Sequence, residues 1–267
     1  MIDTHAHLNF KDFEKDYQKI ISRSFDNGVT AIINVGSNFE TSKRACEIAK
    51  EFSEEKIGIF AAVGLHPIHA KDENFVEEKY VELIKNKVYL KAIGETGLDY
   101  FHLAKEEEKI KDKQKEIFIK QLNLAKKFDL PIIIHSRSTI KHPEKSYLDI
   151  LKILDNLEFS SKGVIHCFPA NWQIAKKFLK RDFYLGFNGT ITFPNGNYKE
   201  VIKNTPLEKI LLETDCPYLA PQAVRGTRNE PKNLFYIAKE MAKIKNEPMT
   251  KIIKTTDQNA QKFFNLI

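Results

Sequence analysis

Short apolar runs alternate with longer amphipathic segments along the whole chain. The runs are rich in β-branched residues and predict eight strands, at about residues 2–8, 29–35, 58–65, 88–95, 131–135, 163–168, 183–189 and 208–214. Apolar positions at helical spacing predict helices between them, at about residues 12–27, 39–52, 73–86, 106–128, 145–156, 171–180, 197–204 and 231–245. Eight strand-and-helix units are typical of a parallel sheet covered by helices. We therefore expect an α/β fold, a closed (β/α)₈ TIM barrel, with one extra C-terminal helix at about residues 249–265.

Length and composition agree with a single domain over residues 1–267. A chain of 267 residues with 42% hydrophobic content is long enough for one sizeable core. No apolar run approaches the roughly 18 residues of a membrane span, and the N-terminus lacks the pattern of a signal peptide. The three cysteines are odd in number and far apart, as is typical of reduced thiols. We expect a cytoplasmic protein without a membrane partner, and a monomer because no unusual apolar stripe remains after the helices are assigned.

The charge of the chain permits an anionic substrate without requiring one. The net charge of +6 is small for a chain with 29% charged residues. Only six basic residues are arginines, and Arg137, Arg225 and Arg228 lie close to the candidate chemistry described below. Because the guanidinium group binds phosphate oxygens in a forked geometry, these arginines are candidates for phosphate contacts.

Candidate metal ligands follow the predicted strands. His5 and His7 end the first strand, and because alternate residues share a face, both imidazoles can point into the barrel mouth. Other predicted strand ends carry His66, Glu95, His135, His166 and Asp215. The C-terminal strand ends of a TIM barrel meet at one rim, so these side chains are expected to converge. Without His66, six ligand candidates remain, more than the four of a closed zinc site, and they predict two divalent cations that share a bridging carboxylate, Glu95.

The segments that carry these residues resemble the TatD family of metal-dependent deoxyribonucleases. The similarity is collinear over essentially the whole chain and rests on MIDTHAHL, VGLHP, IGETGLDY, PIIIHSR, IHCF, GFNGTIT, LLETDCPYLAP and RGTRNEP. The resemblance implies a TIM-type barrel, two divalent cations and hydrolysis of phosphodiester bonds in DNA. We expect single-stranded DNA or a strand end as the substrate and exonucleolytic cleavage, and the sequence leaves RNA as a substrate and endonucleolytic cleavage open.

The resemblance also implies roles for individual residues. Ligands of the first metal would be His5, His7, Glu95 and Asp215, and ligands of the second would be Glu95, His135 and His166. The family positions that face the substrate phosphate correspond to His66 and Arg225. The sequence STIKHPEKSYLDIL after HSR departs from the family pattern, which leaves the roles of Arg137 and His142 open.

A water held between two cations would supply hydroxide for attack on phosphorus. In this hypothesis Asp215 orients the water and accepts its proton, Glu95 bridges the cations, and His66 stabilises charge on the phosphate with Arg225, while Arg137 is a candidate substrate contact. Imidazole ligands favour zinc or manganese, whereas the family chemistry is commonly supported by magnesium or manganese, so the metal stays open between Mg, Mn, Zn or a similar cation. Glu213 shares the face of Asp215 and could hydrogen-bond a ligating histidine.

Three alternatives remain open at this point. An amidohydrolase or phosphotriesterase-like enzyme would hydrolyse a small amide, lactone or ester on the same barrel. That class often bridges its metals with a lysine from the fourth strand, and here Lys91 precedes Glu95 by four residues. A catalytically idle scaffold would not need all six ligands. Cys167 and Cys216 adjoin ligand positions and invite a nucleophile role, but strand alternation predicts that they pack away from the site.

Overall fold

The computed structural model describes residues 1–53, 58–85, 88–101, 103, 107–194 and 198–266. Eight parallel strands pair in chain order: β1 (Ile2–Ala6), β2 (Ala31–Val35), β3 (Ile59–Val63), β4 (Leu90–Asp99), β5 (Ile132–Arg137), β6 (Gly163–Ile165), β7 (Tyr184–Phe187) and β8 (Ile210–Leu212). The segment after β8 closes the ring on β1, because Asp215 N donates to His5 O at 2.8 Å and His7 N donates to Cys216 O at 2.9 Å. The expected TIM barrel is confirmed.

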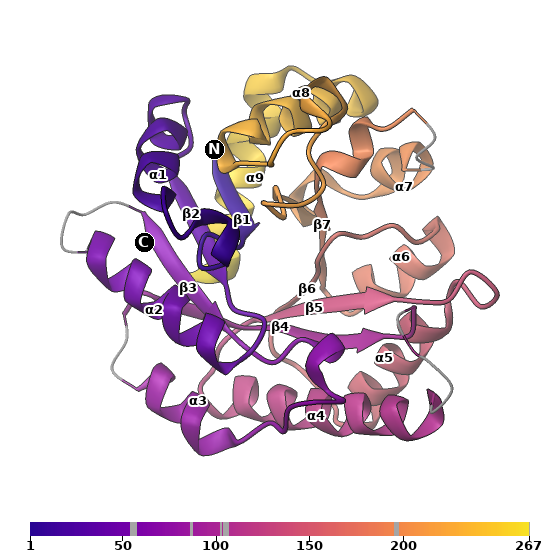
Figure 1. Ribbon diagram of the computed structural model, residues 1–267. Coiled ribbons are helices and arrows are strands. Elements are labelled where there is room, and N and C mark those ends of the chain that lie inside the picture. Colours follow the sequence, from indigo (N-terminus) through magenta and orange to yellow (C-terminus); the bar gives the residue numbers. More distant parts are fainter. Residues whose placement is uncertain (54–57, 86–87, 102, 104–106, 195–197, 267) are drawn as a thin grey trace.

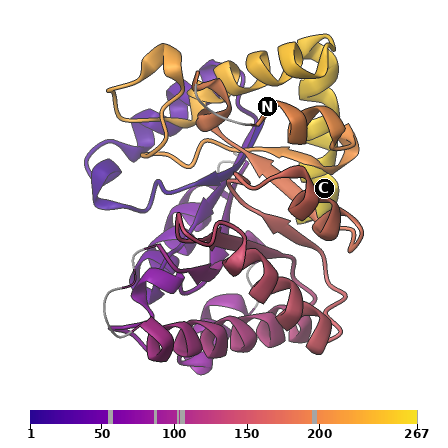
Figure 2. The same ribbon diagram turned by 90° about the vertical axis from the view of Figure 1, so that its right-hand side faces the viewer.

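Helices surround this barrel (Figures 1 and 2). The α-helices are α1 (Tyr17–Asp26), α2 (Phe39–Ser53), α3 (Glu77–Ile84), α4 (Glu107–Lys127), α5 (Lys145–Asn156), α6 (Trp172–Leu179), α7 (Lys199–Asn204), α8 (Leu234–Lys245) and α9 (Met249–Phe264). The expected helix boundaries at residues 86, 106 and 197 lie outside the described residues. Among the described residues, no helix combines the length and apolar character needed to span a bilayer.

Two expected elements need correction. The strand expected at 88–95 continues to Asp99, because its pairing with β5 extends to Asp99 opposite Arg137. The single helix expected over 12–27 is divided into a short 3₁₀ helix, η1 (Lys11–Phe13), and α1. Arg228 binds this junction, where it donates to the carbonyl of Asp12 and to the carboxylate of Asp16. A residue more than 200 positions away in the sequence thus contacts both sides of the interruption.

The hydrophobic core has two layers. The larger layer lies between the sheet and the helices and includes Ile32 and Ile134. The smaller layer fills the barrel interior and includes Ile33, Ile133 and Phe263 of α9. α9 covers the end of the barrel where the strands begin, since Ile2 N donates to the carboxylate of Asp257 at 2.8 Å. The opposite end, where the strands finish, is left for polar side chains.

Candidate metal centre

Simple alternation along β5 and β6 directs two histidines into the barrel mouth. Ile133 and Val164 belong to the interior layer, so His135 and His166, two residues further on, share their face. His166 is 4% exposed, and its ring stacks on the ring of His5 with centroids 3.8 Å apart. These strands behave as the sequence pattern predicts.

β1 reaches the same result through a bulge. Ile2 lies in the interior layer, so strict alternation would turn His5 and His7 outward. Asp3 pairs with Ile32 and Ala6 with Asn34, so three residues of β1 advance against two of β2. The extra residue reverses the alternation. As a result both imidazoles point inward, with His5 Nε2 only 3.2 Å from His7 Nε2.

β4 contains an equivalent irregularity. Ile93 pairs with Ile132 and Thr96 with Ile134, which again sets three residues against two. Gly94 within it has φ +148°, and a Cβ there would lie 2.7 Å from the Cβ of Ile133. Only glycine fits this close approach without displacing β5. The bulge turns Thr96 outward toward Gln121 of α4 and places Glu95 at the centre of the mouth.

The first group of donors surrounds one oxygen of Glu95. Glu95 Oε2 lies 3.4 Å from His5 Nε2 and 3.8 Å from His7 Nε2. Asp215 Oδ1 lies 3.9 Å and 3.4 Å from the same two nitrogens. Bonds of about 2.1 Å in a tetrahedral site separate ligand atoms by roughly 3.4 Å, so these four atoms suit one divalent cation.

The second group surrounds the other oxygen of Glu95. Glu95 Oε1 lies 2.9 Å from His135 Nδ1, 3.4 Å from His166 Nε2 and 3.4 Å from His66 Nε2. The structure thus brings together all six expected ligands and also His66. Within the described residues, every ion pair of Glu95 and Asp215 is with a histidine, so no lysine or arginine takes the place of a cation.

His66 differs from His7 in the hydrogen-bond partner of its Nδ1 nitrogen. His7 Nδ1 faces the carbonyl of Val35 at 2.8 Å, so this nitrogen carries the proton and Nε2 keeps its lone pair for a cation. His66 differs, because its Nδ1 accepts the N–H of Ile68 at 3.1 Å. In neutral His66 the proton therefore sits on Nε2, which is a donor toward the centre. That geometry suits contact with an anionic substrate better than metal ligation.

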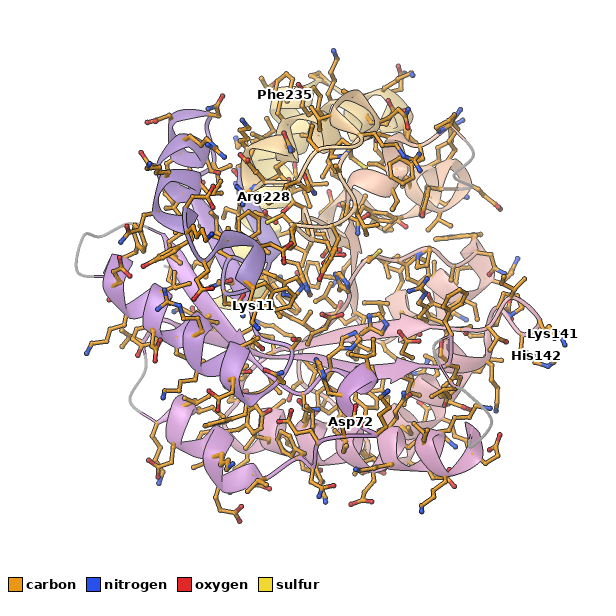
Figure 3. All side chains as sticks on the ribbon, in the orientation of Figure 1. Lys11, Asp72, Lys141, His142, Arg228 and Phe235 are labelled. Atoms are coloured by element: carbon orange, nitrogen blue, oxygen red, sulfur yellow. The ribbon has the colours of Figure 1, made fainter. Side chains whose placement is uncertain are left out.

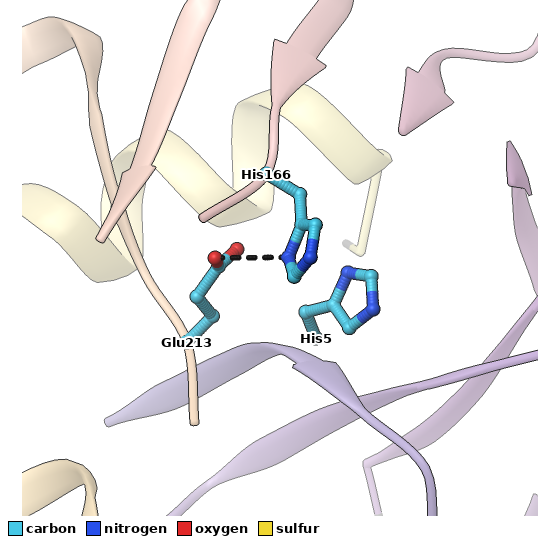
Figure 4. Close-up of side chains that lie close together, drawn as sticks. All are labelled: His5, His166 and Glu213. Atoms are coloured by element: carbon cyan, nitrogen blue, oxygen red, sulfur yellow. Dashed lines mark ion pairs between the residues drawn. The ribbon is translucent and has the colours of Figure 1, made fainter. Parts of the chain in front are cut away.

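Buried carboxylates orient the second pair of histidines. His166 Nδ1 lies 3.0 Å from Oε1 of Glu213, as Figure 4 shows beside His5. His135 Nε2 faces Oδ2 of Asp99 at 3.1 Å. Sequence reasoning proposed Glu213 but missed Asp99, because the fourth strand was expected to end at Glu95. Alternation from Glu95 through Gly97 would have placed Asp99 on the same inner face.

Electrostatics of the centre agree with a cation-binding role. Burial opposes charge on His135 and His166, but the carboxylates of Asp99, Glu95 and Glu213 outweigh it and raise their pKa values to about 9 and about 10. Burial lowers the pKa of His66 to about 4 despite the nearby Glu95 carboxylate, so His66 is neutral near pH 7. Without a metal, protons on His135 and His166 balance the negative charge of the buried carboxylates. Divalent cations would balance the same charge when bound.

The arginines of the rim occupy different positions. Arg137 Cζ lies 4.0 Å from the ring centre of Phe101, and Arg225 Cζ lies 4.5 Å from that of Phe193. Both side chains are exposed at the mouth end. Arg228 is instead bound to Asp16, and His142 lies at the tip of a loop, away from the centre (Figure 3).

The structure does not favour Cys167 or Cys216 as a nucleophile. Cys216 is fully buried, but Cys167 is only half-buried and has φ +45°, so it lies beyond β6 and strand alternation does not govern it. Burial and the nearby Asp215 and Glu213 carboxylates raise the pKa of the Cys167 thiol, which disfavours a nucleophilic thiolate.

Lys91 Nζ donates to the carbonyl of Asn265 at 2.8 Å, next to α9 and away from the mouth. Lys91 therefore cannot supply a bridge between metals.

The barrel and its paired donor groups define the class of metal-dependent hydrolases built on a TIM barrel. The chain belongs to the TatD family, because the family model of TatD-related DNases matches residues 2–265. It is 37% identical to YabD of Bacillus subtilis, an uncharacterized metal-dependent hydrolase, over 100% of this chain and 99% of that protein. The crystal structure of YjjV, a TatD homologue of Escherichia coli, has a TM-score of 0.86 at 29% identity and covers 99% of this chain and 98% of that chain.

A TatD family hydrolase from Entamoeba histolytica has the same TM-score, 0.86, at 24% identity, over 100% of this chain and 98% of that chain. At this level of identity the match supports the fold alone.

Proposed function

We propose that this protein hydrolyses phosphodiester bonds in DNA with two divalent cations, removing nucleotides from single-stranded DNA or a strand end. One observation carries the proposal: the two oxygens of Glu95 face two separate groups of nitrogen donors, His5 with His7 and His135 with His166. A carboxylate in this position is suited to bridge two cations. Such a pair would lower the pKa of a shared water and neutralise charge on the phosphate.

The protein's own side chains supply the remaining functions. Asp215 presents Oδ1 beside the first donor group, where it can orient a water and accept its proton. Its pKa is lowered because the bonds to His7 and the charge of the neighbouring histidines outweigh the effect of burial, so it is ionised at neutral pH. His66 Nε2 donates a hydrogen bond toward a phosphate oxygen.

The preference for an anionic polymer over a small neutral ester rests on the rim. Arg137 ends β5 and Arg225 lies in the segment after β8, so they provide cationic contacts on two sides of the mouth. The position of Lys91 at the other end of the barrel argues against the lysine-bridged amidohydrolase alternative. Manganese, magnesium and zinc are all compatible with the mixed nitrogen and oxygen donors.

The decisive experiment measures nucleotide release from a labelled single-stranded oligonucleotide with Mn²⁺, with and without EDTA. We expect release by the native protein, loss of release with EDTA, and at least about 100-fold slower release by Glu95→Ala. Glu108→Ala, on the exposed face of α4, is the matched control and should keep full activity. Elemental analysis should find two cations per native chain.

Two results would contradict the proposal. Equal turnover by Glu95→Ala and the native protein would remove the bridging role of this carboxylate. Hydrolysis of a lactone or amide without cleavage of DNA would support the small-substrate alternative instead.

A further inference from the structure

A pocket of about 410 Å³ opens between the end of β5 with the loop after it and the segment that follows β6. One wall includes Arg137 and Thr139, and the other includes Pro169 and Ala170. Its volume lies in the range of small-molecule sites. The first wall begins two residues after His135 and the second begins three residues after His166, so both walls continue the chain segments that carry the second donor group.

Contacts within the protein connect this pocket to the centre. His135 Nε2 faces Oδ2 of Asp99, and Oδ1 of the same carboxylate accepts the N–H of Phe101 at 2.9 Å. Phe101 lines the pocket, and its ring is 42% exposed although Arg137 lies over it. Arg137 lies on the face of β5 that carries His135, about 7 Å further along the strand. Arg137, one residue of the pocket wall, thus lies about one nucleotide's length from His135 along the strand, roughly 7 Å.

The chemistry of the walls suits a planar heteroaromatic ring. Phe101, Pro143 and Pro169 provide flat apolar surface, while Thr139 offers a hydroxyl group at the rim. Glu144 is the acidic residue of the lining, and its Oε1 accepts a hydrogen bond from Asn171 Nδ2. Proteins that bind single strands combine cationic groups with aromatic surfaces on which bases stack.

We propose that this pocket, lined by Phe101, Arg137, Thr139 and Ala170, binds the base of a nucleotide flanking the scissile phosphate. Arg137 then holds the phosphate side of that nucleotide while Phe101 provides the stacking surface. The proposal rests on the proposed function, because it concerns DNA bound at the same centre. The loop between β5 and α5, where the sequence departs from the family pattern, thereby gains a role in substrate selection.

Oligonucleotides with a single abasic tetrahydrofuran residue test the pocket directly. We expect an abasic residue on one side of the scissile phosphate to reduce kcat/KM by roughly tenfold for the native protein, the value of one stacked base. Ala170→Phe fills the pocket and should remove this difference between intact and abasic substrates. Phe101→Ala, which leaves the pocket open but removes the stacking surface, should have the same effect. Ser161→Phe, at the other end of β6, is the matched control and should retain the tenfold difference.

A binding measurement separates this proposal from the proposed function. Fluorescence anisotropy in EDTA should show tighter binding of the intact than of the abasic oligonucleotide, with the difference lost in Ala170→Phe. If no oligonucleotide is cleaved but this binding difference persists, the nuclease proposal fails and the pocket assignment stands. Equal cleavage and equal binding of intact and abasic oligonucleotides by the native protein would overturn the pocket assignment.

Discussion

The imidazole of His135 is held between two carboxylates, with Nδ1 2.9 Å from Oε1 of Glu95 and Nε2 3.1 Å from Oδ2 of Asp99. Asp99 therefore fixes the proton on Nε2 and leaves Nδ1 free for a cation. His166 Nδ1 lies 3.0 Å from Oε1 of Glu213, and His7 Nδ1 faces the carbonyl of Val35 at 2.8 Å. Three of the candidate ligand rings therefore have an oxygen acceptor from another part of the barrel beside one ring nitrogen.

Replacing Asp99 by asparagine should weaken the binding of the second cation, at the donor group of His135 and His166. We expect the cation affinity to fall by 10- to 100-fold, the usual effect of removing an outer partner of a ligating histidine. In the metal-free protein the pKa of His135 should drop below about 9, because its main stabilising carboxylate is lost. Metal titration and histidine NMR measure the two effects. Asp112→Asn, on an exposed stretch of α4, should change neither.

Glu213 can be tested without changing its charge. A Cβ on Gly186 would lie 2.5 Å from Oε2 of Glu213, so Gly186→Ala should push this carboxylate away from His166. We expect Gly186→Ala and Glu213→Gln to weaken cation binding to a similar extent, about 10- to 100-fold. Native affinity in both variants would show that Glu213 does not orient His166.

Cation binding should release protons at neutral pH. The pKa values of about 9 for His135 and about 10 for His166 mean that both rings are charged in the metal-free protein at pH 7.5. Both must become neutral to bind a cation, so affinity should rise with pH until the pH passes these values. Calorimetry at pH 7.5 in two buffers of different ionisation enthalpy should report about two protons released per chain from these two rings. Cation binding without proton release would contradict the assignment of His135 and His166 as ligands.

The packing of α9 against the barrel interior should contribute to the stability of the protein. Phe263 of α9 is 1% exposed and packs against Tyr184 of β7, with ring centroids 5.2 Å apart. Phe263→Ala should lower the free energy of unfolding by about 3–5 kcal/mol, as expected for a large cavity in a core. Phe235→Ala removes a ring that is 44% exposed on α8 and should change it by about 0.5 kcal/mol or less. Urea denaturation of the metal-free proteins measures both.

The amino-acid sequence by itself determined the architecture and most of the centre. Periodicity two in the strands and 3.6 in the helices is a local property, so eight units and the extra helix could be predicted before any tertiary contact was known. His135 and His166 follow interior residues at a spacing of two, and their inward direction also follows from local geometry. The convergence of ligands at one rim then follows from the parallel order of the strands.

Only the tertiary structure decided how the remaining ligands enter the centre. Strict alternation from Ile2 turns His5 outward, and strict alternation from Ala92 does the same to Glu95; the bulges that reverse both depend on pairing with β2 and β5. The ring nitrogens of His7 and His135 likewise face groups distant in sequence, the carbonyl of Val35 and the carboxylate of Asp99. Register and hydrogen bonding between strands are non-local, so no pattern within a single strand specifies them.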